Sequence, residues 1–306
     1  MTFMKNIQLK DGINLSEFSL GCMNLPLSDS AETEKIIGRA LEAGVTHFDT
    51  ADLYQFGENE RVVGNILRKF QADYDFTIGT KAGNEFDAAK QEKIGWNPSA
   101  SHLKEAIKQS ISRLGVEVID LYQLHGGTIE DNKDETIGAF EDLKQEGLIR
   151  SYGISSIRPN VINYYMKHSS ISTLMMQFNL IDNRPLEILD DINSDVTVLA
   201  RGPVMKGLLS KNSKEILKDK FEDGVMDYSQ SELNHTIDAL SALNPDLTAL
   251  SYGFLRHHNA VIVNGVSSIE QLESNIDSYN QMPELSQGDL DQIMAAVKMM
   301  KYEAHR

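Results

Sequence analysis

The sequence predicts a closed (β/α)8 barrel, and three features of the chain favour that fold. Short apolar runs alternate with longer amphipathic segments, and eight such pairs follow one another along the 306 residues. Strands that alternate with helices imply a parallel sheet whose faces are covered. Eight pairs in roughly 250 residues is the usual size of a closed barrel. An open doubly wound sheet is the alternative, but no GxGxxG sequence follows the first strand.

The strands are expected at the short apolar runs. The first ends in Ser19-Leu20-Gly21, and the others are expected at 45–48, 76–78, 118–124, 152–154, 174–178, 196–200 and 260–263. Apolar residues spaced three and four apart predict the helices. These are expected at 36–44, 58–70, 103–114, 137–147, from 159 onward, and at 185–192, 230–243, 247–257, 269–279 and 290–300. Gly44, Gly115 and Gly147 are typical helix ends.

Two further segments extend the eight pairs. Asp11-Gly12 is a strong turn signal and predicts an N-terminal hairpin. The polar stretch 210–227 is expected to be an inserted loop, and extra helices close the C-terminal end. Because no linker separates the two halves, we expect one barrel domain over residues 1–306.

The composition limits the class of protein and its partners. Hydrophobic residues make up 41% and charged residues 24%, as in ordinary globular proteins. No apolar run approaches the roughly 20 residues that cross a bilayer, and the start MTFMKNIQLKDG lacks the apolar stretch of a secretory signal. Cys22 alone cannot form an internal disulfide, which favours a reducing, cytoplasmic compartment. The net charge of −16 disfavours a nucleic-acid partner.

Four reactive side chains are expected at one end of the barrel, where the strands end and active sites of this fold lie. Asp49 and the following Tyr54 come after the second strand, Lys81 after the third and His125 after the fourth. Alone, each has an ordinary interpretation as a helix cap, a packed ring, a solvated ammonium or a structural histidine. Together they are harder to explain, because a buried Asp or Lys without a partner is costly.

This set of side chains suits proton donation to a carbonyl oxygen. A tyrosine is a poor acid at its ordinary pKa of about 10, and a neighbouring ammonium favours the phenolate. Tyr54 is then the acid, Lys81 tunes it, Asp49 holds Lys81 charged, and His125 orients the carbonyl. None of these groups carries a hydride, so a cofactor must supply it.

The same residues resemble the aldo-keto reductase family. The resemblance starts at Phe48-Asp49-Thr50-Ala51-Asp52-Leu53-Tyr54 and continues through Thr80-Lys81, Leu124-His125, Gly153-Ile154-Ser155-Ser156, Gln177-Phe178-Asn179, Gly202-Pro203, Gly207-Leu208-Leu209 and Glu270-Gln271-Leu272-Glu273-Ser274-Asn275. The family's tetrad of Asp, Tyr, Lys and His matches Asp49, Tyr54, Lys81 and His125. The chain is most similar to bacterial general-purpose members, which implies NAD(P)H-dependent reduction of an aldehyde or ketone.

The resemblance also implies residues for an extended nicotinamide cofactor across the barrel mouth. Ser155, Ser156 and Gln177 would hold the carboxamide, although Ser155-Ser156 could simply cap the next helix. Gly21, Cys22 and Met23 would line the ribose side, and Gly202, Val204, Lys206 and Gly207 would meet the pyrophosphate. Asp49 is expected to contact the cofactor as well. The family more often uses NADP(H), so NADPH is expected and NADH is the alternative.

The sequence departs from the family at two places. Where many members carry a tyrosine that stacks on the nicotinamide, this chain has Arg201. A guanidinium can stack, but its charge disfavours the oxidised, cationic nicotinamide; pairing of Arg201 with a carboxylate is the equal alternative. The stretch 265–271, where several members bind the 2′-phosphate, has no basic residue. A helix N-terminus at Ser267 and Ser268, with donors from Gln271 and Asn275, is expected to replace it.

Two other functions stay open. Lys81 could form a Schiff base with a substrate carbonyl, which would make the protein a barrel lyase. Some members of the family are non-catalytic cofactor-binding subunits, and an intact tetrad does not exclude that. The histidines lack metal-ligand spacing, so no metal site is expected, and we expect a monomer. The substrate loops are expected around Trp96, at 126–133 and in the C-terminal tail, with Trp96, Phe56 and Phe86 as a possible apolar lip.

Overall fold

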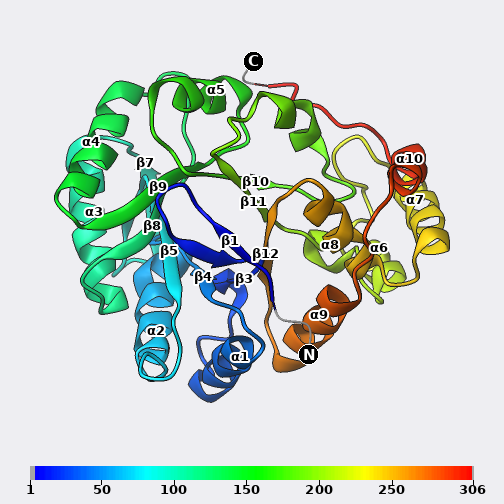
Figure 1. Ribbon diagram of the computed structural model, residues 1–306, viewed down its shortest axis with the longest axis horizontal. Coiled ribbons are helices and arrows are strands. Elements are labelled where there is room, and N and C mark those ends of the chain that lie inside the picture. The colour runs from blue at the N-terminus through cyan, green and yellow to red at the C-terminus, as the bar shows by residue number, and fades with distance from the viewer. Residues whose placement is uncertain (1–3, 305–306) are drawn as a thin grey trace.

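The computed structural model describes residues 4–304, so the first three and last two residues of the predicted domain lie outside the described residues. Its centre is a closed barrel of eight parallel strands (Figure 1). These strands are β3 (Phe18–Gly21), β4 (His47–Asp49), β5 (Thr77–Ala82), β8 (Ile119–Leu124), β9 (Ile149–Ser155), β10 (Thr173–Gln177), β11 (Thr197–Arg201) and β12 (Val261–Gly265). They pair in chain order, and β12 closes the ring on β3. The predicted fold is confirmed.

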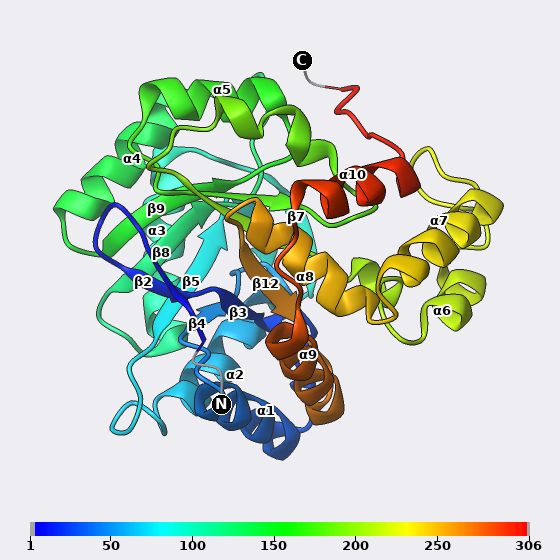
Figure 2. The same ribbon diagram turned by 45° about the vertical axis from the view of Figure 1, so that its right-hand side comes forward.

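Helices cover the outside of the barrel (Figures 1 and 2). They are α1 (Ser30–Glu42), α2 (Glu58–Leu67), α3 (Ala100–Leu114), α4 (Lys133–Gln145), α5 (Pro159–His168), α6 (Ser213–Lys220), α7 (Gln230–Leu243), α8 (Leu247–His257), α9 (Ile269–Gln281) and α10 (Gln287–Ala296). Their apolar faces pack on the outward side chains of the strands in one continuous core. Gly115 ends α3 in the left-handed conformation, as its place in the sequence predicts.

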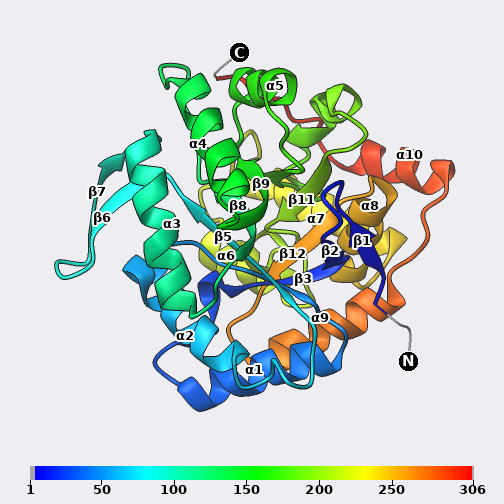
Figure 3. The same ribbon diagram turned by 60° about the vertical axis from the view of Figure 1, so that its left-hand side comes forward.

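Two expectations about secondary structure in these segments are wrong, and one hairpin was not expected. The predicted helix 185–192 is a pair of short 3-10 turns, Arg184–Glu187 and Leu189–Asp191, because Ile188 between them has a φ of −121° and breaks the helix. The predicted loop 210–227 contains α6, a short amphipathic helix. The segment after β5 forms an unexpected hairpin of β6 (Asn84–Asp87) and β7 (Glu92–Trp96), which projects beside α3 in Figure 3. Its many charged residues hide any strand alternation.

The N-terminal hairpin closes the bottom of the barrel. Strands β1 (Asn6–Gln8) and β2 (Asn14–Ser16) are joined by five residues rather than by the two-residue turn expected at Asp11-Gly12, and Gly12 takes a φ of +82°. Its apolar side chains enter the barrel and pack on inward residues of four strands. These are Leu9, Ile13 and Leu15 against Leu121, Met175, Leu199, Val261 and Val263. The barrel interior is therefore a filled core at this end, and only the opposite end is free for a site.

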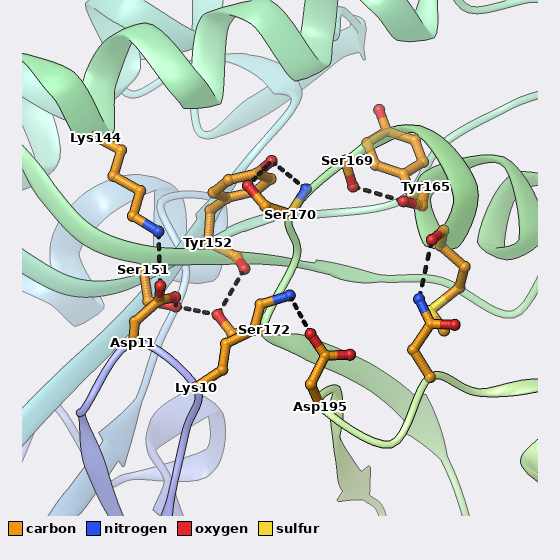
Figure 4. A network of polar contacts seen from close by, with 12 residues as sticks. Lys10, Asp11, Lys144, Ser151, Tyr152, Tyr165, Ser169, Ser170, Ser172 and Asp195 are labelled. Carbon is orange, nitrogen blue, oxygen red and sulfur yellow. Dashed lines mark hydrogen bonds and ion pairs between the residues drawn. The ribbon is translucent and has the colours of Figure 1, made fainter.

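Polar contacts fix this hairpin to the barrel (Figure 4). Asp11 accepts from Lys144 Nζ and from Ser151 Oγ, both at 2.7 Å, and Lys10 Nζ lies 3.0 Å from Asp195. These contacts join the hairpin to α4, to β9 and to the loop before β11. Their role is structural. Within residues 4–304, no helix has the length and apolar character that crossing a membrane requires.

Candidate active site

The four reactive side chains lie together at the carboxyl ends of neighbouring strands, which form the mouth of the barrel. Asp49 ends β4, Lys81 lies near the end of β5, and His125 directly follows β8. Tyr54 begins a short turn between β4 and α2. Parallel pairing of β4 with β5 and of β5 with β8 brings these ends side by side, because parallel strands finish at the same edge.

Lys81 and Asp49 form a buried ion pair. Lys81 Nζ donates to Asp49 Oδ2 at 2.7 Å and to the carbonyl oxygen of Thr50 at 2.6 Å. Burial alone would lower the pKa of Lys81, but the charges and the hydrogen bond of its neighbours, Asp49 first among them, together outweigh burial and raise the pKa above its ordinary value. Burial raises the pKa of Asp49, and Lys81 opposes that rise. We take the pair as ionised, because each charge has its partner at hydrogen-bond distance.

Tyr54 lies over this ammonium. Lys81 Nζ is 5.3 Å from the centre of the Tyr54 ring, and an ammonium has three donors, of which Asp49 and Thr50 use two. The turn that carries Tyr54 is strained, since Gln55 and Phe56 take φ values of 45° and 54° and Gly57 follows at 90°. Left-handed backbone at residues other than glycine costs about 1–2 kcal/mol each and is typical of functional sites.

Asn59 holds this strained turn in place. It is fully buried at the start of α2, and its amide donates to the carbonyl of Cys22 at 2.9 Å and to Gln55 Oε1 at 3.1 Å. Thr50 Oγ1 donates to Asn59 Oδ1 at 2.7 Å. A single side chain thus connects the end of β3, the residue after Asp49 and the turn of Tyr54.

His125 lies beside the Tyr54 ring, with the ring centres 5.8 Å apart and the planes nearly perpendicular. Burial is the main reason that the pKa of His125 falls to about 3, and the positive charges of Lys81, Arg201 and Lys93 lower it further. The ring is therefore neutral near pH 7. Its Nδ1 is buried without a hydrogen-bond partner among the described residues. A neutral imidazole can donate one hydrogen bond, and so can the Tyr54 hydroxyl. The two side chains can therefore both donate to one carbonyl oxygen.

The residues expected to hold a carboxamide lie at the ends of β9 and β10. Ser155 ends β9 and Gln177 ends β10, and both are partly buried at the mouth. Ser156 is buried and its Oγ accepts from the backbone N–H of Arg158 at 3.3 Å, so part of its role is local capping. The hydroxyl of Ser155 and the amide of Gln177 are a donor–acceptor set that suits a primary amide.

The residues on either side of this pair complete the expected cofactor surface. Gly21 ends β3, Cys22 is fully buried, and Met23 is 53% exposed. Gly202 and Gly207 take φ values of 65° and 92°, as close turns require. The expected pyrophosphate residues Val204 and Lys206 lie in the same turn after β11. The turn after β11 thus combines glycines, which let a ligand approach the backbone closely, with the positive charge of Lys206, and both features suit a pyrophosphate. Together with Ser155 and Gln177, the residues present fit the implied dinucleotide cofactor.

Arg201 makes a contact that the sequence does not reveal. It ends β11 opposite Gln177, and its Nη1 donates to Gln177 Oε1 at 3.1 Å. No ion pair of Arg201 exists among residues 4–304, so the structure gives the guanidinium an amide partner rather than the carboxylate considered as an alternative. Its charge acts on both Asp49 and His125, which places the cation at the mouth.

The N-terminus of α9 is already occupied by side chains of the protein itself. Gln271 Oε1 accepts from the backbone and the hydroxyl of Ser267, and Ser268 Oγ caps the backbone N–H of Gln271. Glu32, from α1, accepts from the backbone N–H of Ile269 at 2.9 Å. Asn275 lies one turn further on. A carboxylate therefore lies where a 2′-phosphate was expected, and no cation accompanies it in 265–271.

Two of the expected substrate loops, the one around Trp96 and the one at 126–133, contact each other. Phe56 and Phe86 have ring centres 5.9 Å apart, and Trp96 Nε1 donates to Asp131 in the loop after β8 at 2.9 Å. The Trp96 ring covers Gly83, whose missing Cβ would lie 2.8 Å from it. Phe56 and Phe86 thus contact each other, and an apolar lip that also includes Trp96 stays a prediction. Among the described residues, no group of three or more metal-binding side chains is placed to hold a metal ion.

Sequence reasoning missed several residues that support the site. Besides Asn59, two acidic side chains are buried below the Tyr54 turn: Asp52 is 1% exposed and Glu60 is fully buried. Glu60 accepts from Thr80 Oγ1 at 2.5 Å and pairs with Arg113 at 2.6 Å. The signal for Asn59 and Glu60 is their position on the inward face of α2, where an apolar residue would be normal.

The structure is a closed barrel with a buried Lys–Asp pair, a tyrosine and a histidine at its mouth, an arrangement that suits an oxidoreductase. Comparison with known proteins identifies the family. The profile of the aldo/keto reductase family matches residues 17–298, so the chain belongs to this family, whose members couple a nicotinamide cofactor to carbonyl reduction. The chain is 43% identical over 300 residues to an uncharacterised oxidoreductase of Bacillus subtilis, YqkF, and covers 96% of both chains.

Solved structures support the same family assignment. The aldo-keto reductase AKR11C1 from Bacillus halodurans in its holo form has a TM-score of 0.90 and 41% identity, with 99% of both chains covered. Its apo form has a TM-score of 0.81 at the same coverage. The glycerol dehydrogenase AKR11B4 from Gluconobacter oxydans, with a TM-score of 0.80 over 95% of this chain and 94% of its own, is 21% identical and supports the fold alone.

Proposed function

We propose that this protein reduces an aldehyde or ketone to an alcohol with Asp49, Tyr54, Lys81 and His125 as its catalytic group. The observation that carries the proposal is the buried Lys81–Asp49 pair, 2.7 Å apart, directly below the Tyr54 ring. An ammonium fixed at that place favours the phenolate of Tyr54 and so makes Tyr54 a better proton donor. A purely structural contact would not require a buried charge, because burying a charge is costly.

The proposed mechanism assigns one task to each residue. Tyr54 donates its hydroxyl proton to the carbonyl oxygen as the alcohol forms, and Lys81 stabilises the phenolate that remains. Asp49 keeps Lys81 charged and oriented, and neutral His125 donates a hydrogen bond that orients the carbonyl. When bound, the nicotinamide cofactor supplies the hydride. A positioned acid of this kind contributes about 10² to 10⁴ in rate.

Ser155, Ser156 and Gln177 would hold the carboxamide, and the residues around β3 and the turn after β11 would hold the rest of the cofactor. Our proposed cofactor is NADPH, with NADH as the alternative. Glu32 of α1, whose carboxylate accepts from the backbone N–H of Ile269 at the start of α9, is the feature that favours NADH. The relatives' names include both an aldo-keto reductase with NADP(+) from Schizosaccharomyces pombe and an NADH-specific methylglyoxal reductase from Escherichia coli, each 24% identical. We further propose one monomeric domain in the cytoplasm and a small carbonyl substrate.

Parallel fluorescence titration with NADPH and NADH tests the cofactor, and turnover of a panel of aldehydes and ketones tests the chemistry. Saturable binding with turnover supports the proposal. Binding with negligible turnover across the panel would indicate a non-catalytic cofactor-binding subunit. If neither cofactor binds at millimolar concentration, the Schiff-base lyase becomes the better candidate, and borohydride trapping of substrate on Lys81 would then identify it.

A further inference from the structure

Both amide hydrogens and the amide oxygen of Asn59 have partners inside the protein. The side chain is fully buried, and its nitrogen donates to the carbonyl of Cys22 at 2.9 Å and to Gln55 Oε1 at 3.1 Å. Its oxygen accepts from Thr50 Oγ1 at 2.7 Å. Among side chains of this length, only that of asparagine combines two donors and an acceptor without a charge. The contacts at position 59 therefore require an amide, and not merely a side chain of that size.

The contact with Thr50 reaches the catalytic ammonium. The carbonyl oxygen of Thr50 accepts from Lys81 Nζ at 2.6 Å, and the hydroxyl of the same residue donates to Asn59. The backbone N–H of Thr50 donates to the carbonyl of Gly79 at 2.8 Å, so this residue is also fixed to β5. Asn59 is therefore bound to a residue that is itself held beside Lys81.

The contact with Gln55 reaches the proposed proton donor. Gln55 directly follows Tyr54, and its side chain is held at both ends, since Oε1 accepts from Asn59 and Nε2 donates to the carbonyl of Met23 at 3.3 Å. Gln55 and Phe56 take φ values of 45° and 54°, a conformation that residues with a side chain rarely adopt. Such a turn persists only where its surroundings hold it, so a contact that fixes Gln55 also fixes the neighbouring Tyr54.

The remaining contact reaches the side on which the cofactor is expected. Cys22 and Met23 lie in the short turn that follows β3, and their carbonyl oxygens accept from Asn59 and Gln55. Both residues of this turn were expected to line the ribose side of the cofactor. One amide thus connects the turn after β3, the residue that holds the catalytic ammonium, and the turn of Tyr54.

We propose that Asn59 is a positioning residue for Tyr54. With the hydroxyl of Thr50, its amide holds the proton donor at a fixed place relative to the Lys81 ammonium and to the turn after β3. Asn59 is fully buried, so it acts through Tyr54 and not by contact with a substrate. A displacement of the reacting groups by about 1 Å can cost about 10² in rate. The catalytic consequence rests on the proposed function; the role of the amide in holding the turn does not.

Fluorine-19 NMR tests the holding of the turn without any substrate. 3-Fluorotyrosine replaces the 10 tyrosines, and the Tyr54 signal is assigned by its loss in Tyr54→Phe. We expect one narrow Tyr54 signal in the wild type and a shifted or broadened signal in Asn59→Leu and in Thr50→Val. Valine keeps the shape of threonine but lacks the hydroxyl that donates to Asn59. Asn65→Leu, the same substitution at an exposed position of α2, is the control and should leave the signal as in wild type.

Single-turnover reduction with bound cofactor tests the catalytic consequence, because product release cannot mask the chemical step. The rate should fall by about 10² in Asn59→Leu and by about tenfold in Thr50→Val, which loses one of the three hydrogen bonds. Thr50→Ser keeps the hydroxyl and should recover most of the rate that Thr50→Val loses. The affinity for the carbonyl substrate should change little in these variants, because His125 still orients the carbonyl.

Two results would overturn the proposal. One is a Tyr54 signal in Thr50→Val that matches that of wild type, and the other is an equal single-turnover rate in these two proteins. If Asn59→Leu does not fold, Thr50→Val decides by itself. A wild type that reduces no carbonyl refutes the proposed function instead, and the fluorine signal then decides the role of Asn59 alone.

Discussion

Lys81 Nζ lies 2.7 Å from Asp49 Oδ2, and their side chains are 1% and 5% exposed. Such a pair is weak as a stabilising device, because the desolvation of two charges offsets most of their attraction. It becomes useful where a fixed charge must act on a third group. The third group is the Tyr54 ring, 5.3 Å from the same ammonium, and the functional predictions start from this arrangement.

Replacement of Tyr54 by phenylalanine should remove the proton donor while keeping the ring. We expect kcat for carbonyl reduction to fall by about 10² to 10⁴, because that is the usual contribution of a positioned acid. The affinity for the nicotinamide cofactor, measured by fluorescence titration, should change little. Full turnover in Tyr54→Phe would show that another group donates the proton.

Replacement of Lys81 by methionine should remove the charge that stabilises the Tyr54 phenolate. The pKa of Lys81 is raised by Asp49, so the wild-type ammonium stays charged through the whole neutral range. The variant should therefore lose at least about tenfold in kcat at pH 7, and its pH–rate profile should change shape. An identical profile for the two proteins, measured from pH 5 to 9, would contradict the tuning role of Lys81.

Glu32→Gln should change the choice between the two cofactors. The Glu32 carboxylate accepts from the N–H of Ile269 at the start of α9, where it would repel a 2′-phosphate. The amide keeps the hydrogen-bond acceptor and removes the charge. We expect the ratio of NADPH to NADH affinity to rise by about fivefold or more, in line with charge effects of roughly 1 kcal/mol at a helix terminus. Glu34→Gln, a change on the same helix, is the control. An unchanged ratio would show that the charge of Glu32 does not affect the choice of cofactor.

The buried His125 should make the fold sensitive to acid. Its pKa is about 3 in the folded state, against 6.5 as the ordinary value, mainly because it is buried. Between these values the unfolded chain binds a proton that the folded protein does not, so stability is lost as the pH falls. From pH 7 to 5, wild type should lose about 2 kcal/mol more unfolding free energy than His125→Gln. Urea denaturation measures this, and exposed His235→Gln should behave as wild type.

How far the sequence predicts this protein depends on how local each feature is. The strand ends at Asp49 and Lys81 follow from periodicity, and parallel pairing alone brings them together. The contact of Glu32 with Ile269 joins residues 237 positions apart where the barrel closes, and no local pattern indicates it. The hairpin β6–β7 was missed because its strands are too polar to show alternation. The sequence predicts that Arg201 lies at the end of its strand, but it does not show that the hydrogen-bond partner of Arg201 is Gln177 rather than a carboxylate.

A matched pair of glycine substitutions should separate close helix packing from helix propensity. A Cβ on Gly64 in α2 would lie 2.2 Å from the carbonyl oxygen of Leu114 and 2.5 Å from its Cα, both backbone atoms of α3. Gly64→Ala should therefore push α2 from α3 and destabilise the protein by about 3 kcal/mol. Gly138 in α4 has nothing within 4 Å of its missing Cβ.

Gly138→Ala should instead stabilise the protein by about 0.5–1 kcal/mol, because alanine loses less conformational entropy in a helix. Urea denaturation of the two variants beside wild type gives both values from one experiment. Because α2 also carries Asn59, which holds the turn of Tyr54, Gly64→Ala should lower kcat even where it remains folded. A fully active and equally stable Gly64→Ala would mean that α2 and α3 can separate without moving the site.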